Sequence, residues 1–95
     1  MKGYIVCVYK SINDENALKD YALEAKAAVD KYKGKFLVRG GEKITTEGEN
    51  WIRTTLIEFA SFAEAKAFFY SDEYQKAHLI LKGTVVRHHQ ILEGF

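Results

Sequence analysis

KYKGKFLVRGG, residues 31–41, is the stretch in which a helix gives way to a strand. Gly34 follows two lysines, and a glycine in the left-handed conformation is a common helix stop. Residues 36–38 are apolar and typical of a strand, and Gly40 and Gly41 then indicate a bulge or an early turn. The stretch therefore predicts a helix before residue 34 and a strand directly after it.

Before this stretch, the sequence predicts one strand and one helix. Tyr4 to Tyr9 is a run of β-branched and aromatic residues, typical of a strand that is covered on both faces. Asp14 and Glu15 favour the start of a helix, and apolar residues then recur every three or four positions as far as Tyr32.

After the paired glycines, the sequence predicts the second half of a hairpin. Residues 42–50 are expected to extend the hairpin, with a tight turn near residues 47–50. A strand is then predicted from Trp51 to Phe59.

A helix and a last strand complete the chain. Ser61 and Glu64 have the spacing of a capping box, and Ser71 predicts a second cap at which the helix breaks and restarts. This helix is expected to end at residues 82–83, and a strand is predicted at residues 84–92.

The order βαββαβ predicts an α+β, ferredoxin-like fold with a four-stranded antiparallel sheet. Right-handed crossovers place both helices on one face of that sheet. We expect one domain, residues 1–95. The strands at 4–9 and 51–59 are apolar on both faces, so the face without helices also needs cover. The same face of a second subunit would supply it by two-fold symmetry, which predicts a homodimer.

Composition limits the compartment and the partners. The net charge of +1 gives no electrostatic case for binding nucleic acid or an anionic membrane. No segment approaches the length of about 18 apolar residues that a membrane span needs. Met1-Lys2-Gly3 leads into a strand and does not resemble a signal peptide, so we expect a cytoplasmic protein. The single cysteine, Cys7, agrees with a reducing compartment and cannot build a metal site alone.

Several segments along the whole chain carry a family resemblance through their order and spacing. They are Met1-Lys2-Gly3-Tyr4, Lys35 to Gly41, Arg53 ahead of Ile57-Glu58-Phe59, Ser71 with Glu73-Tyr74-Gln75, and Ile91 to Gly94. Together they resemble the bacterial "domain of unknown function 1330" family. This resemblance implies the dimeric α/β-barrel superfamily, with a homodimer whose sheets pack face to face around a cavity. It implies no established activity, because monooxygenases, haem-degrading enzymes and isomerases share that fold.

All three arginines of the chain (Arg39, Arg53 and Arg87) fall in predicted strands. A guanidinium is a planar fork that suits a carboxylate or a phosphate, so Arg39 and Arg53 are candidates to hold an anion. Two registers remain open. A tight turn sets Arg39 opposite Glu58 as an ion pair, which we favour because opposite charges usually face each other on a sheet. A long loop sets Arg39 opposite Arg53, which calls for an anion between them.

The predicted last strand departs from the family pattern at Arg87-His88-His89, where many relatives carry small or acidic residues. His88 and His89 point to opposite faces of a strand, so they cannot chelate one metal ion together. Either histidine could transfer protons, or ligate haem with His78 or a symmetry mate. We favour interface or hydrogen-bonded histidines, and we expect no metal and no cofactor.

Two classes of function stay open on the sequence alone. The first is a small cytoplasmic homodimer that binds a small organic molecule, anionic ones included, in a cavity between sheet and helices. As an enzyme, it would be a cofactor-independent monooxygenase or isomerase in which His88 or His89 moves protons. The second class is a non-enzymatic structural or stress-related interaction protein, whose arginines serve only ion pairs. The candidate ligand-binding residues for the first class are Tyr4, Arg39, Trp51, Arg53 and Glu58.

Overall fold

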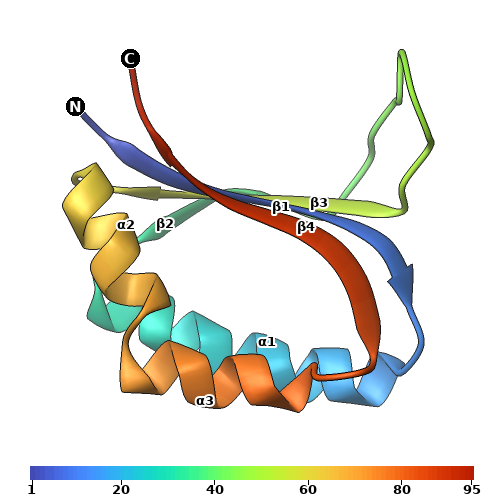
Figure 1. Ribbon diagram of the computed structural model, residues 1–95, viewed down its shortest axis with the longest axis horizontal. Coiled ribbons are helices and arrows are strands. Elements are labelled where there is room, and N and C mark those ends of the chain that lie inside the picture. The colour runs from blue at the N-terminus through green and yellow to red at the C-terminus, as the bar shows by residue number, and fades with distance from the viewer.

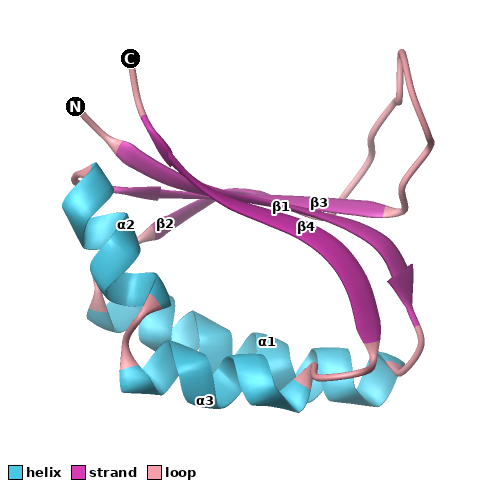
Figure 2. Cartoon of the chain, in the orientation of Figure 1, coloured by secondary structure: helices cyan, strands magenta, loops and turns pink.

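The computed structural model describes all 95 residues as a four-stranded antiparallel sheet with three helices on one face (Figures 1 and 2). The sheet order is β2-β3-β1-β4. In chain order, the elements are β1 (Gly3–Ile12), α1 (Glu15–Lys31), β2 (Lys35–Arg39), β3 (Arg53–Phe59), α2 (Phe62–Phe69), α3 (Asp72–Ile80) and β4 (Val85–Glu93). This is the predicted ferredoxin-like arrangement, with its second crossover helix divided into α2 and α3. None of the helices is both long and apolar enough to cross a membrane.

Serine caps start the two helices of the second crossover. Ser61 Oγ accepts a hydrogen bond from the backbone N–H of Glu64 at 3.1 Å. Ser71 Oγ does the same for the N–H of Tyr74, also at 3.1 Å. These bonds satisfy backbone donors that have no partner inside the helix. The predicted break and restart at Ser71 is therefore confirmed.

The junction between α1 and β2 differs in detail from the prediction. The left-handed residue is Lys33, with φ 58°, and not Gly34. Gly34 is needed for space, because a Cβ at this position would lie 2.6 Å from the ring of Phe59 and 3.0 Å from Val29. The helix ends where expected, but the glycine there permits a close approach of side chains and does not supply the left-handed turn.

The predicted extension of the hairpin over residues 42–50 is wrong. Residues 40–52 form a long loop without strand, which rises from the sheet on the side away from the helices (Figure 1). Gly40 and Gly41 have φ values of 69° and 94°, and such left-handed residues turn the chain out of the sheet directly after β2. β2 also bulges once, between Phe36 and Val38.

The two faces of the sheet have different surroundings. On the helix-facing side, Ile5, Ile57 and Phe59 pack against buried residues of all three helices and form the core. The other face, which we call the open face, has no helix over it (Figure 2). Val86 and Leu92, both on β4, are 52% and 41% exposed.

Candidate functional site

Strand register gathers the polar residues of the helix-facing side into two neighbouring rows. In the first row, Arg53 of β3 and Arg87 of β4 flank Tyr9 of β1. All three arginines of the chain lie on the helix-facing side, with Arg39 on β2 and Arg87 on β4, the two edge strands of the sheet. The second row, read from β2 to β4, contains Arg39, Thr55, Cys7 and His89.

A cavity of about 50 Å³ lies between these rows and the helices. Arg39, Arg53, Arg87 and His89 belong to its wall, together with tyrosines and the apolar side of α1. None of its 17 lining residues is an aspartate or a glutamate. A space of this size holds a few water molecules or a small polar group. Three permanently charged guanidinium groups thus line a small space that contains no compensating carboxylate.

Arg87 donates hydrogen bonds to uncharged acceptors. Its Nη1 donates to the hydroxyls of Tyr9 at 3.0 Å and Tyr21 at 3.3 Å. Its Nη2 donates to the Tyr74 hydroxyl and to His78 Nδ1, both at 3.1 Å. Since a guanidinium can only donate, His78 Nδ1 carries no proton. Burial lowers the pKa of Arg87, but the phenol groups of Tyr21 and Tyr74 raise this pKa more, so the side chain stays cationic.

Arg53 and Arg39 occupy the inside and the rim of the cavity. The Nε of Arg53 is buried and has no hydrogen-bond partner. Such an unsatisfied donor costs about 1–3 kcal/mol. Arg39 is exposed, and its guanidinium stacks 4.5 Å from the centroid of the Phe36 ring. Neither arginine forms an ion pair with a carboxylate, because both ion pairs of the structure are made by lysines.

The predicted ion pair between Arg39 and Glu58 does not form. Arg39 is paired with Thr55, and Glu58 is paired with Lys35. Glu58 lies on the open face, where its carboxylate accepts a hydrogen bond from the Tyr4 hydroxyl at 3.1 Å. Both registers considered from the sequence are therefore wrong. The chain leaves the sheet at residue 40 and β2 bulges, so the pairing cannot be counted from a turn.

The remaining candidates from the sequence are divided between separate places. Trp51 lies in the loop before β3, and its Nε1 donates to the Glu49 carboxylate at 2.6 Å. His88 is exposed on the open face, whereas His89 lies in the cavity wall. The structure thus brings Arg39, Arg53 and His89 together, and it keeps Tyr4, Trp51, Glu58 and His88 away from them.

Sequence reasoning missed Arg87 and the side chains that bind it. Tyr21 and Tyr74, whose hydroxyls are 2.9 Å apart, lie on two different helices, and only the packing of α1 against α3 brings them together. One signal was available in the sequence. Arg87 and His89 are two residues apart on one strand, so they share a face.

The two histidines of the site are uncharged at neutral pH. Burial, followed by the charge of Arg87 and the nearby His78 imidazole, lowers the pKa of His89 to about 3. Burial and Arg87 also lower the pKa of His78. Burial raises the pKa of the Cys7 thiol, which therefore stays protonated. No group of three or more His, Cys, Asp or Glu side chains is placed to hold a metal ion.

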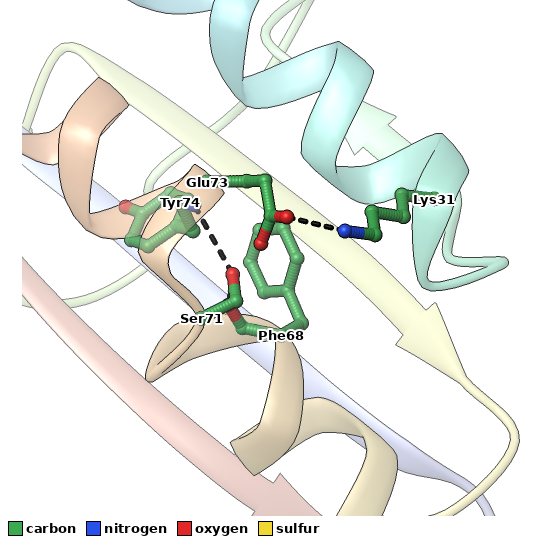
Figure 3. A network of polar contacts seen from close by, with 5 residues as sticks. All are labelled: Lys31, Phe68, Ser71, Glu73 and Tyr74. Atoms are coloured by element: carbon green, nitrogen blue, oxygen red, sulfur yellow. Dashed lines mark hydrogen bonds and ion pairs between the residues drawn. The ribbon is translucent and has the colours of Figure 1, made fainter.

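Contacts outside the cavity fix the helix that carries Tyr74 and His78. Lys31 of α1 forms an ion pair with Glu73 of α3 (Figure 3). The same view shows Ser71 at the start of α3, where its Oγ accepts a hydrogen bond from the backbone N–H of Tyr74. The position of α3 is thus set at its first turn, close to the residues that bind Arg87.

Comparison with known proteins identifies the family. The family model described as Domain of unknown function (DUF1330) matches residues 2–95. The chain belongs to the DUF1330 family. No curated protein matches its sequence.

Solved structures similar to this DUF1330 member share its fold at low sequence identity. A protein of unknown function from Rhodopseudomonas palustris has a TM-score of 0.77 and 14% identity, over 99% of this chain and 82% of that one. A dimeric ferredoxin-like protein of unknown function from Jannaschia sp. CCS1 has a TM-score of 0.69 and 18% identity, over 99% and 100%. SnoaB, a cofactor-independent oxygenase from Streptomyces nogalater, has a TM-score of 0.68 and 6% identity, over 99% and 93%. These similarities show the ferredoxin-like fold.

Proposed function

We propose that the protein binds a small organic anion in the cavity between the sheet and the helices. The observation that carries this proposal is the set of three arginines, Arg39, Arg53 and Arg87, around one cavity whose wall contains no acidic residue. Taking a charge out of water without a counter-charge costs on the order of several kcal/mol. A bound carboxylate or phosphate would supply the missing counter-charge.

The three arginines would serve the anion in different ways. Arg53 has a buried N–H without an acceptor, so it offers a directional hydrogen bond inside the cavity. Arg39 is exposed and adds a planar fork at the rim. Arg87 already donates to three tyrosines and to His78, so it contributes mainly its charge.

The size of the cavity limits the ligand. A volume of about 50 Å³ accommodates an acid group and few further atoms. The rest of a larger ligand would therefore extend out of the cavity. Leu18 and Ala22 of α1, which also line the cavity, offer apolar contact to its carbon atoms.

We further propose that the protein works as a homodimer, assembled through the open face of the sheet. Val6 and Leu56 are paired on this face, over which no helix lies. Structures with this fold from Bacteroides fragilis and Jannaschia are described as dimeric. Pairing of two open faces would leave each helix-facing cavity within its own subunit.

Thermal shift and calorimetry with monocarboxylates and inorganic phosphate test the binding proposal. At least one compound is expected to raise the melting temperature, and to raise it further as its concentration increases. Arg53→Gln should weaken that binding roughly tenfold or more, because a charged hydrogen bond is worth about 1.5–3 kcal/mol. Lys19→Gln removes the same charge from an exposed position on α1 and should bind like the wild type. If no compound shifts the wild type, the class of interaction protein is favoured instead.

A second candidate function is cofactor-independent proton transfer, as in an isomerase or an oxygenase. The position of His89 favours it, because this imidazole lies in the same cavity wall as the arginines. Its lowered pKa makes it a weak base in the empty cavity, and a bound anion that offsets the charge of Arg87 would raise that pKa toward the range of a general base. One structure with this fold is described as a cofactor-independent oxygenase. Hydrogen exchange of keto acids in heavy water, followed by NMR, tests the idea. The wild type should accelerate exchange next to the carbonyl and His89→Gln should not; equal rates for both would exclude His89 as the base.

A further inference from the structure

A second, larger space adjoins the cavity. This groove of about 510 Å³ lies between the C-terminal end of α3 and the strand β4. Half of its eight lining residues are basic, and none is acidic. The basic residues are His78, Lys82, Arg87 and His89.

The groove and the cavity share two wall residues. Arg87 and His89 line both spaces, since they project from the same face of β4. Arg87 is held in place by the tyrosine hydroxyls and by His78, so its charge stands at the boundary between the two spaces. A ligand that extends from the cavity into the groove would pass this charge.

Lys82 is the exposed cation of the groove. It lies in the turn after α3, where its backbone N–H bonds to the carbonyl of Leu79 at 3.2 Å. The two ion pairs of the structure do not involve it, so its ammonium is available to a ligand. Leu81 and Val85 line the same groove and offer apolar contact to a carbon chain.

We propose that the natural ligand is a dicarboxylate, with one acid group in the cavity at Arg53 and the other in the groove at Lys82. This inference rests on the proposed anion-binding function. The cations along the path outnumber the charge of one carboxylate, and no acidic residue of the protein balances them in either space. The backbones of Arg53 and Arg87 are two strand spacings apart, about 10 Å, and Lys82 lines the groove beyond Arg87, so the ligand needs an extended carbon chain between its acid groups.

Pairs of acids with the same chain length test the inference by calorimetry. The probes are butyrate with succinate, hexanoate with adipate, and octanoate with suberate. We expect the dicarboxylate to bind up to about fivefold tighter than its monocarboxylate partner for one of the longer pairs, because fivefold is the upper range for one exposed ion pair.

Variants of two lysines locate the second acid group. Lys82→Ala should remove the advantage of the dicarboxylate and leave the affinity for the monocarboxylate unchanged. Lys76→Ala is the matched control, because it removes an exposed lysine of α3 that lies outside the groove, and it should keep the advantage.

The outcomes separate this inference from the proposed function. If each dicarboxylate binds no tighter than its partner, the groove takes no second acid group and the inference is wrong, while anion binding in the cavity stands. If Lys76→Ala reduces the tighter binding of the dicarboxylate as much as Lys82→Ala does, the effect comes from the overall positive charge of the protein and not from Lys82. The inference is then again wrong. If no acid binds at all, the proposed function fails as well.

Discussion

Gly40 holds a position that only glycine fills without moving Arg53. A Cβ there would lie 2.3 Å from Arg53 Nη1, and the residue has a left-handed φ of 69°. Gly41 is also left-handed, with φ 94°, but a Cβ added there meets no atom within 4 Å. Both glycines therefore adopt a left-handed backbone conformation, but only Gly40 lies against a residue of the candidate site.

Alanine at each glycine should separate these two effects. Both variants place alanine in a left-handed conformation, which costs about 1–2 kcal/mol of folding free energy, measurable by urea denaturation. Only Gly40→Ala should displace the guanidinium of Arg53 and weaken anion binding, by about tenfold in calorimetry. Equal affinities of the two variants would show that the contact with Gly40 does not position Arg53.

His89 should make the folded state less stable in mildly acidic solution. Its pKa is lowered to about 3 by burial, by Arg87 and by His78, whereas an unfolded histidine has a pKa of about 6.5. Between these values, the unfolded chain binds a proton that the folded chain does not bind, so stability falls as the pH falls below about 6.5. The lowered pKa of His78 acts in the same direction.

Urea denaturation near pH 7.5 and near pH 5 measures this effect. The wild type should lose stability at the lower pH, and His89→Gln should lose less. His88→Gln, on the open face, is the control and should lose as much as the wild type. If all three proteins lost the same stability between the two pH values, the pH dependence would not come from His89.

At the scale of elements, Ser71 links two helices to the candidate site. Its Oγ donates to the Phe68 carbonyl at 2.6 Å and accepts from the Tyr74 N–H at 3.1 Å, and the residue is only 8% exposed (Figure 3). Ser61 caps α2 through one hydrogen bond at the surface. Both serines are N-caps, but only Ser71 sets the turn from which Tyr74 reaches Arg87.

Ser71→Ala and Ser61→Ala form a matched pair. Loss of either cap should cost about 0.5–2 kcal/mol in urea denaturation, and Ser71→Ala should lie at the upper end because its site is buried. In addition, Ser71→Ala should weaken anion binding, since Tyr74 and therefore Arg87 lose their fixed position. An unchanged affinity for Ser71→Ala would show that the cap serves stability alone.

Elements that are set by their own local chemistry could be predicted from the sequence. The caps at Ser61 and Ser71 are examples, because side chain and backbone donor lie three residues apart. The hairpin could not be predicted in the same way. Its strand-like residues 42–50 follow Gly40 and Gly41, whose left-handed conformations remove them from the sheet.

The arginine cavity is a property of the whole molecule. The sequence predicts that the helices lie on one face of the sheet, which follows from crossover handedness. Strand parity also puts Arg87 and His89 on one face, although the site at Arg87 was not predicted. The sequence does not predict the register of β1 with β3 and β4, which places Arg53 and Arg87 beside Tyr9. These strands are joined through helices, so their register depends on how the helices pack against the sheet.

The open face predicts that two chains assemble as a dimer. Placing one charged side chain on this face tests that prediction. Leu56 is paired there with Val6 and with Val38, and Val38 is 40% exposed. Light scattering should give the wild type twice the mass of one 10.9 kDa chain. Leu56→Lys should give a mass near one chain, because burial of an unpaired charge in an interface costs on the order of several kcal/mol. Leu23→Lys makes the same change on α1, at a residue that is 74% exposed, and should remain a dimer. A wild-type mass of one chain, or a dimeric Leu56→Lys, would show that the open face is not the interface.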